Sequence, residues 1–307
     1  MSTEARGARS RTDLVGVGFI LLSTLQFGSV VVLGRIATRP GGLPVPSLLA
    51  YRFGVAALLM AGALVLARLP LAAEPGERWP LVALGMIGYA AESGLFFAGL
   101  RHGTAAAITL LFFTYPVLVA VIAFLMGKGL PGWLLGGGLV SAVSGAAIVA
   151  VIGKGVDVSG TGALLALGAA LTFSFYLVAA EAALRRTNSL TGAMWVSASA
   201  AVGLAVFALA TGNASWPNGL RQWGPVLGMA ALSAGAFACL FAGLRRLGAV
   251  RTSILSAAEP LTAGTLAGLF LGESIGWATV LGGVFILAGA IAASVARPPP
   301  FAEPPIP

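Results

Sequence analysis

The chain has 307 residues, of which 58% are hydrophobic and only 9% are charged. A soluble domain has roughly 25% charged residues, so this composition excludes a protein whose entire surface faces water. The net charge of +8 does not indicate a nucleic-acid partner, because the charged residues stand singly between apolar runs. With one cysteine and one histidine, the sequence predicts no disulfide framework, no metal site and no other cofactor.

Ten apolar runs follow one another along the chain, each about as long as a helix that crosses a bilayer. They cover residues 14–36, 47–67, 80–100, 104–126, 131–152, 160–184, 190–210, 223–244, 249–271 and 275–296. The loops between them are short, so we expect an all-α membrane protein with ten transmembrane helices. Arg6, Arg9 and Arg11 precede the first run, but this run is too long for a signal peptide, and we predict that it remains as a span.

The second half of the chain repeats the first. Residues 97–146 return as residues 241–290 without a gap, at an offset of 144, and Pro116 returns as Pro260. Such a duplication of hydrophobic halves is typical of secondary transporters. The predicted units are a first five-helix repeat with an N-terminal arm, a second five-helix repeat and a proline-rich tail: residues 1–155, 156–296 and 297–307.

The distribution of lysine and arginine predicts the orientation. If the N-terminus is cytoplasmic, twelve of these residues lie on the cytoplasmic side and five, including Arg101 and Lys154, on the outer side. Basic residues are retained on the cytoplasmic side, so both termini are predicted to be cytoplasmic. Each half has an odd number of spans, and Arg101 and its repeat mate Arg245 therefore fall on opposite faces. This predicts an inverted repeat.

Polar and aromatic residues in two equivalent spans are candidates for the lining of a substrate pathway. The first span contains Gln26 and Phe27. Corresponding places in the sixth span hold Thr172, Phe173 and Tyr176. Equivalent spans of repeat-built transporters face one another around the substrate. Helix packing by small polar residues is the alternative.

Two carboxylates lie inside predicted spans, where a charge costs several kcal/mol unless it faces a cavity or a partner. Glu92 shares a helix face with Tyr89 in the third span, and Glu259 lies in the ninth. We predict that both line the pathway. The alternative is a structural role, for Glu92 through pairing with Arg52 or a serine. Arg52 itself lies about one turn from a span end, from which its side chain is expected to snorkel to the interface.

Pro116 and Pro260 are equivalent in the two repeats, and each stands inside a predicted span. Proline removes a backbone donor and kinks a helix, so we predict two hinges at the level of a central site. Tyr115, next to Pro116, adds a ring and a hydroxyl to this site. A static kink is the alternative, since membrane helices tolerate proline.

Segment 259–289 begins with Glu-Pro, contains a Gly-Glu pair and ends in a run with several glycines. In this pattern and in its ten predicted spans, the chain resembles the EamA-type members of the drug/metabolite transporter superfamily, most closely the bacterial exporters of aromatic amino acids. The resemblance covers nearly the whole chain. The first half departs from it, because Tyr115-Pro116 replaces Glu-Pro and Gly127-Lys128 replaces Gly-Glu.

The sequence contains no phosphate-binding Gly-x-x-x-x-Gly-Lys run and no catalytic set, so it predicts neither an ATP-driven pump nor an enzyme. We expect a monomeric secondary transporter of the bacterial inner membrane, with the lipid bilayer and a small-molecule substrate as its partners. It is predicted to export amino acids, preferably aromatic ones, or related metabolites by alternating access. An importer or facilitator for other metabolites on the same fold and a non-transporting membrane scaffold remain the alternatives.

Overall fold

Helices make up the regular secondary structure of this chain in its computed structural model. The structure describes residues 3–37, 42–99, 102–103, 105–128, 132–152, 158–271 and 277–295. Within these residues the one contact of β type is an isolated bridge between Gly103 and Val158. The predicted all-α class is therefore confirmed.

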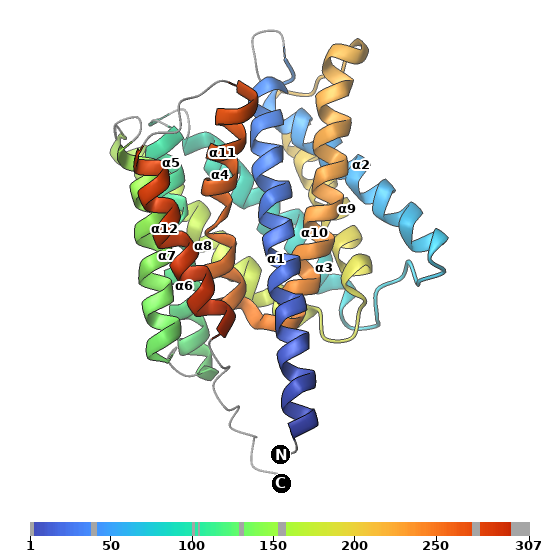
Figure 1. Cartoon of the computed structure of the whole chain (residues 1–307). Helices are drawn as coiled ribbons and strands as arrows, with labels where there is room; N and C mark the ends of the chain where they lie inside the picture. Colours follow the sequence, from blue (N-terminus) through green and yellow to red (C-terminus); the bar gives the residue numbers. More distant parts are fainter. Residues whose placement is uncertain are drawn as a thin grey trace.

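The helical elements follow one another in the order shown by the colours of Figure 1. They are α1 (Thr3–Ala37), α2 (Val45–Leu66), α3 (Arg78–Ala83), the π-helical η1 (Leu84–Tyr89), α4 (Ala90–Gly99), α5 (Ala105–Phe112), α6 (Tyr115–Ala123), η2 (Phe124–Lys128), α7 (Trp133–Ile152), α8 (Gly160–Ala183), α9 (Ser189–Ala210), α10 (Gly219–Ser256), α11 (Glu259–Leu271) and α12 (Trp277–Val295).

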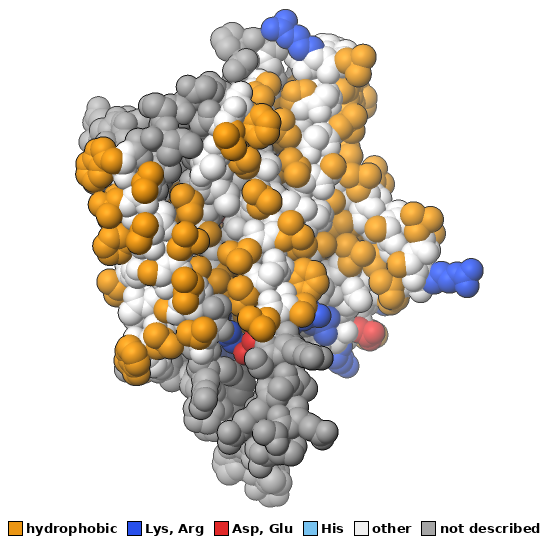
Figure 2. All heavy atoms as spheres, in the orientation of Figure 1, with side chains coloured by type: hydrophobic (Ala, Val, Ile, Leu, Met, Phe, Trp, Pro, Cys, Tyr) orange, Lys and Arg blue, Asp and Glu red, His pale blue; other side chains and the backbone are white. Residues whose placement is uncertain are grey.

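Several helical segments are long and apolar enough to cross a membrane. Within the described residues these are Asp13–Gly34, Val45–Leu66, Arg78–Gly99, Gly160–Ala183, Ser189–Ala210 and Gly219–Ser256. Shorter apolar helices cover Tyr115–Lys128, Trp133–Gly145 and Val280–Ala293. Figure 2 shows a face covered mainly by hydrophobic side chains, with the visible charged side chains near its edges. The chain is a multi-pass membrane protein, and the count of ten spans stays a prediction.

Three predicted spans differ from the helices of the structure. The third contains η1, a π-helical segment in which each turn is wider than in an α-helix. The fourth is interrupted at residues 113–114, between α5 and α6. The ninth, predicted at 249–271, is interrupted at residues 257–258, before α11. Its first part is the segment of α10 that follows Gly248, where the backbone leaves helical geometry with a φ of 76°, within the predicted loop between the eighth and ninth spans.

The long helices pack in pairs. In Figure 1, α1 lies along α10, α2 crosses α9, and α7 lies along α12. The beginning of α1 and the end of α12 lie at the same end of the bundle. On the other side of the core, α8 packs against η1, α4, α5 and α6.

Small residues bring α7 and α12 into close contact. The Ser141 hydroxyl donates a hydrogen bond of 2.8 Å to the Phe285 carbonyl. Two glycine pairs flank this bond: Gly138 with Gly289, and Gly145 with Gly282. A Cβ atom added to Gly145 or Gly289 would lie 2.5 or 2.6 Å from a carbonyl oxygen of the opposite helix. The backbones are therefore close enough that larger residues are excluded, as in other membrane helix pairs.

Candidate functional site

The buried core contains a continuous group of aromatic rings. We call it the aromatic array and define it as Phe27, Phe53, Tyr89, Phe112, Phe113, Tyr115, Phe173, Tyr176 and Phe237. On its first side, Phe237 of α10 lies 5.3 Å from Phe27 of α1 and 5.2 Å from Tyr89 of η1, between ring centroids. Tyr89 lies 5.6 Å from Tyr176 of α8. These separations are those of favourable aromatic pairs.

The second side of the aromatic array joins α8 to α6 and α5. Phe173 stacks on Tyr176 at 5.6 Å with an angle of 15° between the rings. Phe173 also meets Tyr115 edge-on at 4.9 Å, and Phe112 lies 5.6 Å from Phe173. The structure thus brings together all the rings that the sequence predicted as pathway residues: Phe27, Tyr89, Tyr115, Phe173 and Tyr176.

Two buried polar atoms beside the aromatic array have no hydrogen-bond partner within the described part of the chain. They are the Gln26 Oε1 atom in α1 and the Tyr176 hydroxyl in α8. Tyr176 is only 1% exposed. Buried polar atoms are almost always satisfied by protein, water or ligand, and an unmade hydrogen bond costs about 1–3 kcal/mol. These two atoms are therefore suited to contact a polar ligand.

Arg52 is buried in the core, and the expectation that it snorkels to the interface is wrong. Its side chain is 7% exposed, and its Nε atom donates a 2.6 Å hydrogen bond to the Ser233 hydroxyl in α10. Its guanidinium lies 4.6 Å from the centroid of the Phe53 ring, a cation–π distance. It also interacts electrostatically with Tyr89, Glu92 and Glu259. The Arg52 side chain therefore lies in the core and not at the interface, because the Ser233 hydroxyl of α10 accepts its hydrogen bond there.

Glu92 and Glu259 reach the same region from α4 and α11. Glu92 is 8% exposed and accepts a 2.9 Å hydrogen bond from the Ser93 hydroxyl. Glu259 is partly buried at the first residue of α11, where a helix favours negative charge. The two carboxylates interact electrostatically with each other and with Arg52. Within the described residues, however, neither of them forms an ion pair with Arg52.

The two helix interruptions meet at this site. Tyr115 and Pro116 open α6 after the interruption at residues 113–114, and Glu259 and Pro260 open α11 after residues 257–258. The side chain of Tyr115 interacts with that of Ser256, at the end of α10, and electrostatically with Glu259. Both prolines therefore occupy the second position of a helix, where a missing N–H group is tolerated.

Thr172, a predicted pathway residue, makes a contact within its own helix. The Thr172 hydroxyl donates a 2.8 Å hydrogen bond to the Gly168 carbonyl, one turn earlier in α8. The sequence interpretation also missed members of the site: Arg52, Phe53, Phe112, Phe113 and Phe237. A usable signal existed for some of them, because Phe53 follows Arg52 and the Phe112-Phe113 pair precedes Tyr115-Pro116. At the repeat offset of 144, Phe237 corresponds to Ser93, the neighbour of Glu92. This correspondence is the sequence signal for Phe237.

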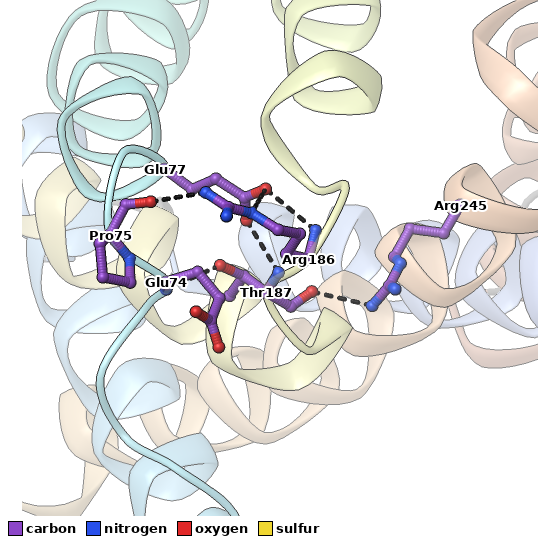
Figure 3. Close-up of polar contacts among 6 residues, drawn as sticks. All are labelled: Glu74, Pro75, Glu77, Arg186, Thr187 and Arg245. Carbon is purple, nitrogen blue, oxygen red and sulfur yellow. Dashed lines mark hydrogen bonds and ion pairs between the residues drawn. The ribbon is translucent and has the colours of Figure 1, made fainter.

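A separate polar cluster lies at one end of the bundle and joins the loop before α3 to the loop between α8 and α9 (Figure 3). The Glu77 carboxylate accepts hydrogen bonds of 2.9 and 2.8 Å from the backbone N–H groups of Arg186 and Thr187. Arg245 of α10 donates a 2.8 Å hydrogen bond to the Thr187 carbonyl. Burial raises the pKa of the Glu77 carboxyl, but the hydrogen bonds from Thr187 and Arg186 outweigh burial and hold this pKa below its ordinary value.

The described residues contain no group of three or more His, Cys, Asp and Glu side chains that is arranged to hold a metal ion. Cys239 is a free thiol in α10.

Comparison with known proteins identifies the class of molecule. The sequence profile of the EamA-like transporter family matches residues 14–151 and again residues 160–295. A curated relative, the uncharacterized transporter YwfM of Bacillus subtilis (strain 168), is 26% identical over 285 residues, which cover 91% of this chain and 93% of the relative. A protein of known crystal structure, 21% identical, has the same fold, with a TM-score of 0.78 over 94% of this chain and all of that chain.

Proposed function

Because the chain belongs to the EamA-like transporter family, we propose that it exports amino acids, preferably aromatic ones, or related small metabolites. The chain is a membrane transporter and not an enzyme. The finer proposal depends on the core described above, since a transporter substrate is recognised by the side chains that it meets at mid-membrane.

The observation that carries this proposal is the aromatic array with the unpartnered Gln26 and Tyr176 atoms beside it. Rings can stack on a flat apolar side chain, and each well-placed aromatic pair contributes about 0.5–1.5 kcal/mol beyond area burial. The two polar atoms offer hydrogen bonds to the polar end of the same substrate. A non-transporting scaffold would gain nothing from buried polar atoms without partners, because each of them costs stability.

The proposed mechanism is alternating access between two inverted five-span halves. The contacts between α7 and α12 support this arrangement, because they are reciprocal. At the repeat offset of 144, Gly138 corresponds to Gly282 and Gly145 to Gly289, while Ser141 donates to its own mate, Phe285. Contacts of this kind are expected where a two-fold axis relates two copies of one surface. The paired helix interruptions provide the places at which each half would bend.

We also propose that both termini are cytoplasmic, from the excess of basic residues on that side. The outer markers Arg101 and Lys154 lie outside the described residues, whereas Arg186 is an exposed residue of the predicted cytoplasmic side. Single cysteines at positions 154 and 186, in a Cys239→Ala background, test the orientation. A membrane-impermeant thiol reagent applied to intact cells is expected to label position 154 and spare position 186. The reverse labelling would reject the orientation.

The transport assignment is tested by counterflow in proteoliposomes. Vesicles loaded with an unlabelled amino acid should accumulate the labelled compound from outside, and phenylalanine, tyrosine and tryptophan should outperform threonine and alanine. Protein-free vesicles provide the background. Vesicles of known orientation then separate export from import. Absence of counterflow with every amino acid of the panel would refute the amino acid proposal.

A further inference from the structure

An apolar groove lies between α2 and α9 and opens to the surface of the bundle. Its volume is about 430 Å³, within the range of about 300–1,000 Å³ of pockets that hold small ligands. Small residues form much of its lining: Gly54, Ala57 and Ala61 of α2, with Ala198 and Ala201 of α9. Leu58 and Val202, which also line it, are 72% and 50% exposed. Because all the described residues that line the groove are Gly, Ala, Leu, Met or Val, it suits a hydrocarbon chain.

The groove has a closed end and an open end. A Cβ atom added to Gly54 would lie 3.8 Å from the Ala201 Cβ atom, so α2 and α9 approach each other closely at that point. Figure 1 shows α2 crossing α9 and then projecting beyond it toward the C-terminal end of α2. The groove therefore follows α2 from the crossing toward the loop that precedes α3.

Arg68 lies beyond the open end of the groove. It follows the last residues of α2, about two helical turns or roughly 10 Å along the axis from Ala61. Its side chain is exposed, and no hydrogen bond or ion pair holds it among the described residues. With a φ of 54°, it is also the one described residue other than glycine with a positive φ. Glycine is the usual residue at such a helix end, so the cation occupies a position where glycine would fit more easily.

A tryptophan places this end of the groove at the membrane interface. The Trp195 Nε1 atom donates a 2.8 Å hydrogen bond to the carbonyl of Leu71, three residues after Arg68. Trp195 follows Met194, which lines the groove. Tryptophan rings prefer the boundary between the hydrocarbon and the headgroups of a bilayer. A molecule whose apolar part fills the groove would therefore have its polar part near Arg68.

We propose that the groove and Arg68 together bind one anionic phospholipid, with an acyl chain in the groove and the phosphate on the guanidinium. Charge complementarity favours this occupant, because a guanidinium bonds to phosphate through parallel N–H groups. The cytoplasmic leaflet, in which Arg68 is predicted to lie, carries the anionic lipids. A free phosphate would leave the groove empty, and an acyl chain without a phosphate would leave Arg68 without a counter-charge. The site includes no member of the aromatic array, so it is independent of the transported substrate.

Retention of lipid by the purified chain tests this inference. The full-length chain in detergent is mixed with equal amounts of a phosphatidylglycerol and a phosphatidylcholine that have the same acyl chains, and native mass spectrometry measures the lipid that stays bound. We expect one phosphatidylglycerol per chain, retained roughly fivefold more than phosphatidylcholine. Inorganic phosphate should not displace it. Equal retention of the two lipids, or displacement by phosphate, would overturn the inference.

Filling the groove tests where the acyl chain lies. Ala198 is an exposed alanine that lines the groove, and Ala198→Phe should remove the excess of phosphatidylglycerol. Ala179→Phe is the matched control, because Ala179 is an exposed alanine of α8 outside the groove, and its retention should equal that of the unmodified chain. Retention unchanged in Ala198→Phe would reject the groove as the site. A dimer in the same spectra that Ala198→Phe removes would assign the groove to a second copy of the chain and reject the lipid.

Replacing the arginine tests the position of the phosphate. Arg68→Gln should lower retention of phosphatidylglycerol to the level of phosphatidylcholine, whereas Arg221→Gln, at an exposed arginine near the start of α10, should leave it unchanged. Arg68→Gly removes the charge and suits the positive φ, so it should lose the lipid without a fall in the unfolding temperature measured before lipid is added. A fall in both quantities, or retention that persists in Arg68→Gln, would show that Arg68 serves the fold and not a lipid.

Discussion

The interruption between α5 and α6 and the interruption between α10 and α11 share one backbone plan. In each, two residues leave the helix, and a new helix begins whose second residue is proline, Pro116 or Pro260. The residue before the proline differs: it is Tyr115 in the first half and Glu259 in the second. Equivalent positions of a duplicated chain have thus kept the geometry and changed the chemistry.

The surroundings of these two residues differ in the same sense. Tyr115 is 1% exposed, and Phe173 packs edge-on against it within the aromatic array. Glu259 is less buried and interacts with Arg52, while its carbonyl accepts a 2.8 Å hydrogen bond from the Thr262 hydroxyl. The first interruption therefore presents a ring to the core, and the second presents a charge. A substrate with an apolar ring and a charged end would meet both.

The largest effect is expected from removing the charge at the second interruption. Glu259→Gln should leave the protein folded in the membrane but lower transport by roughly tenfold or more, since about 1.4 kcal/mol corresponds to one decade. It should also flatten the dependence of transport on pH between about pH 5 and about pH 8. Counterflow rates at constant reconstituted protein measure both effects.

Tyr115→Phe is the matched change at the first interruption, because it removes one polar group and keeps the ring. It should alter the rate much less than Glu259→Gln. If Glu259→Gln transports like the unmodified chain at every pH, the carboxylate is structural and the contrast between the two interruptions has no functional meaning.

A smaller effect is expected from the rings on the aromatic side of the comparison. Phe173→Ala or Tyr89→Ala should weaken an aromatic amino acid by roughly tenfold at most, because a ring pair contributes about 0.5–1.5 kcal/mol. Threonine or alanine, which do not stack, should be affected less. Apparent affinities for both substrates, measured on one variant, control for expression and folding.

Phe207→Ala is the control for this experiment, since Phe207 is 48% exposed on α9 and lies outside the aromatic array. It should change neither affinity. Equal losses for the aromatic and the small substrate in Phe173→Ala would mean that the ring only packs helices, and the preference for aromatic amino acids would lose its residue-level support.

Replacement of the two predicted hinge prolines is expected to change transport still less. Pro116→Ala and Pro260→Ala restore a backbone donor near each interruption and should slow counterflow by roughly two- to fivefold without loss of affinity, if bending of α6 and α11 limits the rate. The two variants should be equally slow, because the backbone plan is shared. If Pro260→Ala slows counterflow and Pro116→Ala does not, only the interruption that carries Glu259 bends during transport.

The sequence predicted the class of fold and much of the core for a physical reason. Membrane helices leave a strong composition signal, and polar or aromatic residues inside them stand out against that background. Tyr89, Phe173 and Tyr176 were found in this way, and the structure places them in one aromatic array.

Other features depend on packing and were not predictable from local pattern. The π-helical segment η1 lies inside the third predicted span, where the sequence predicts an ordinary membrane helix. Arg52 lies close enough to a predicted span end to reach water, and its burial depends on contacts such as the hydrogen bond to the Ser233 hydroxyl of a distant helix. The hydroxyl of Thr172 bonds within α8, and the place of this residue in the pathway stays a prediction.

The smallest effect on transport is expected far from both interruptions, at Glu77, which makes this residue a baseline for the comparison. The folded-state pKa of Glu77 is lowered, so its stabilising effect is present above the unfolded pKa and is lost as the pH falls through the folded pKa. Glu77→Gln leaves one of two backbone donors, the part-buried Arg186 N–H or the buried Thr187 N–H, poorly paired and should lower the free energy of unfolding at neutral pH by about 1–3 kcal/mol. Thermal unfolding in detergent should show the difference from the unmodified chain shrinking under acid conditions.

Glu74→Gln, which alters an exposed carboxylate three residues earlier, is the control and should show no such pattern. Relative counterflow rates for aromatic and small substrates should be unchanged in Glu77→Gln, and a selective loss of either would place part of the selectivity outside the two interruptions.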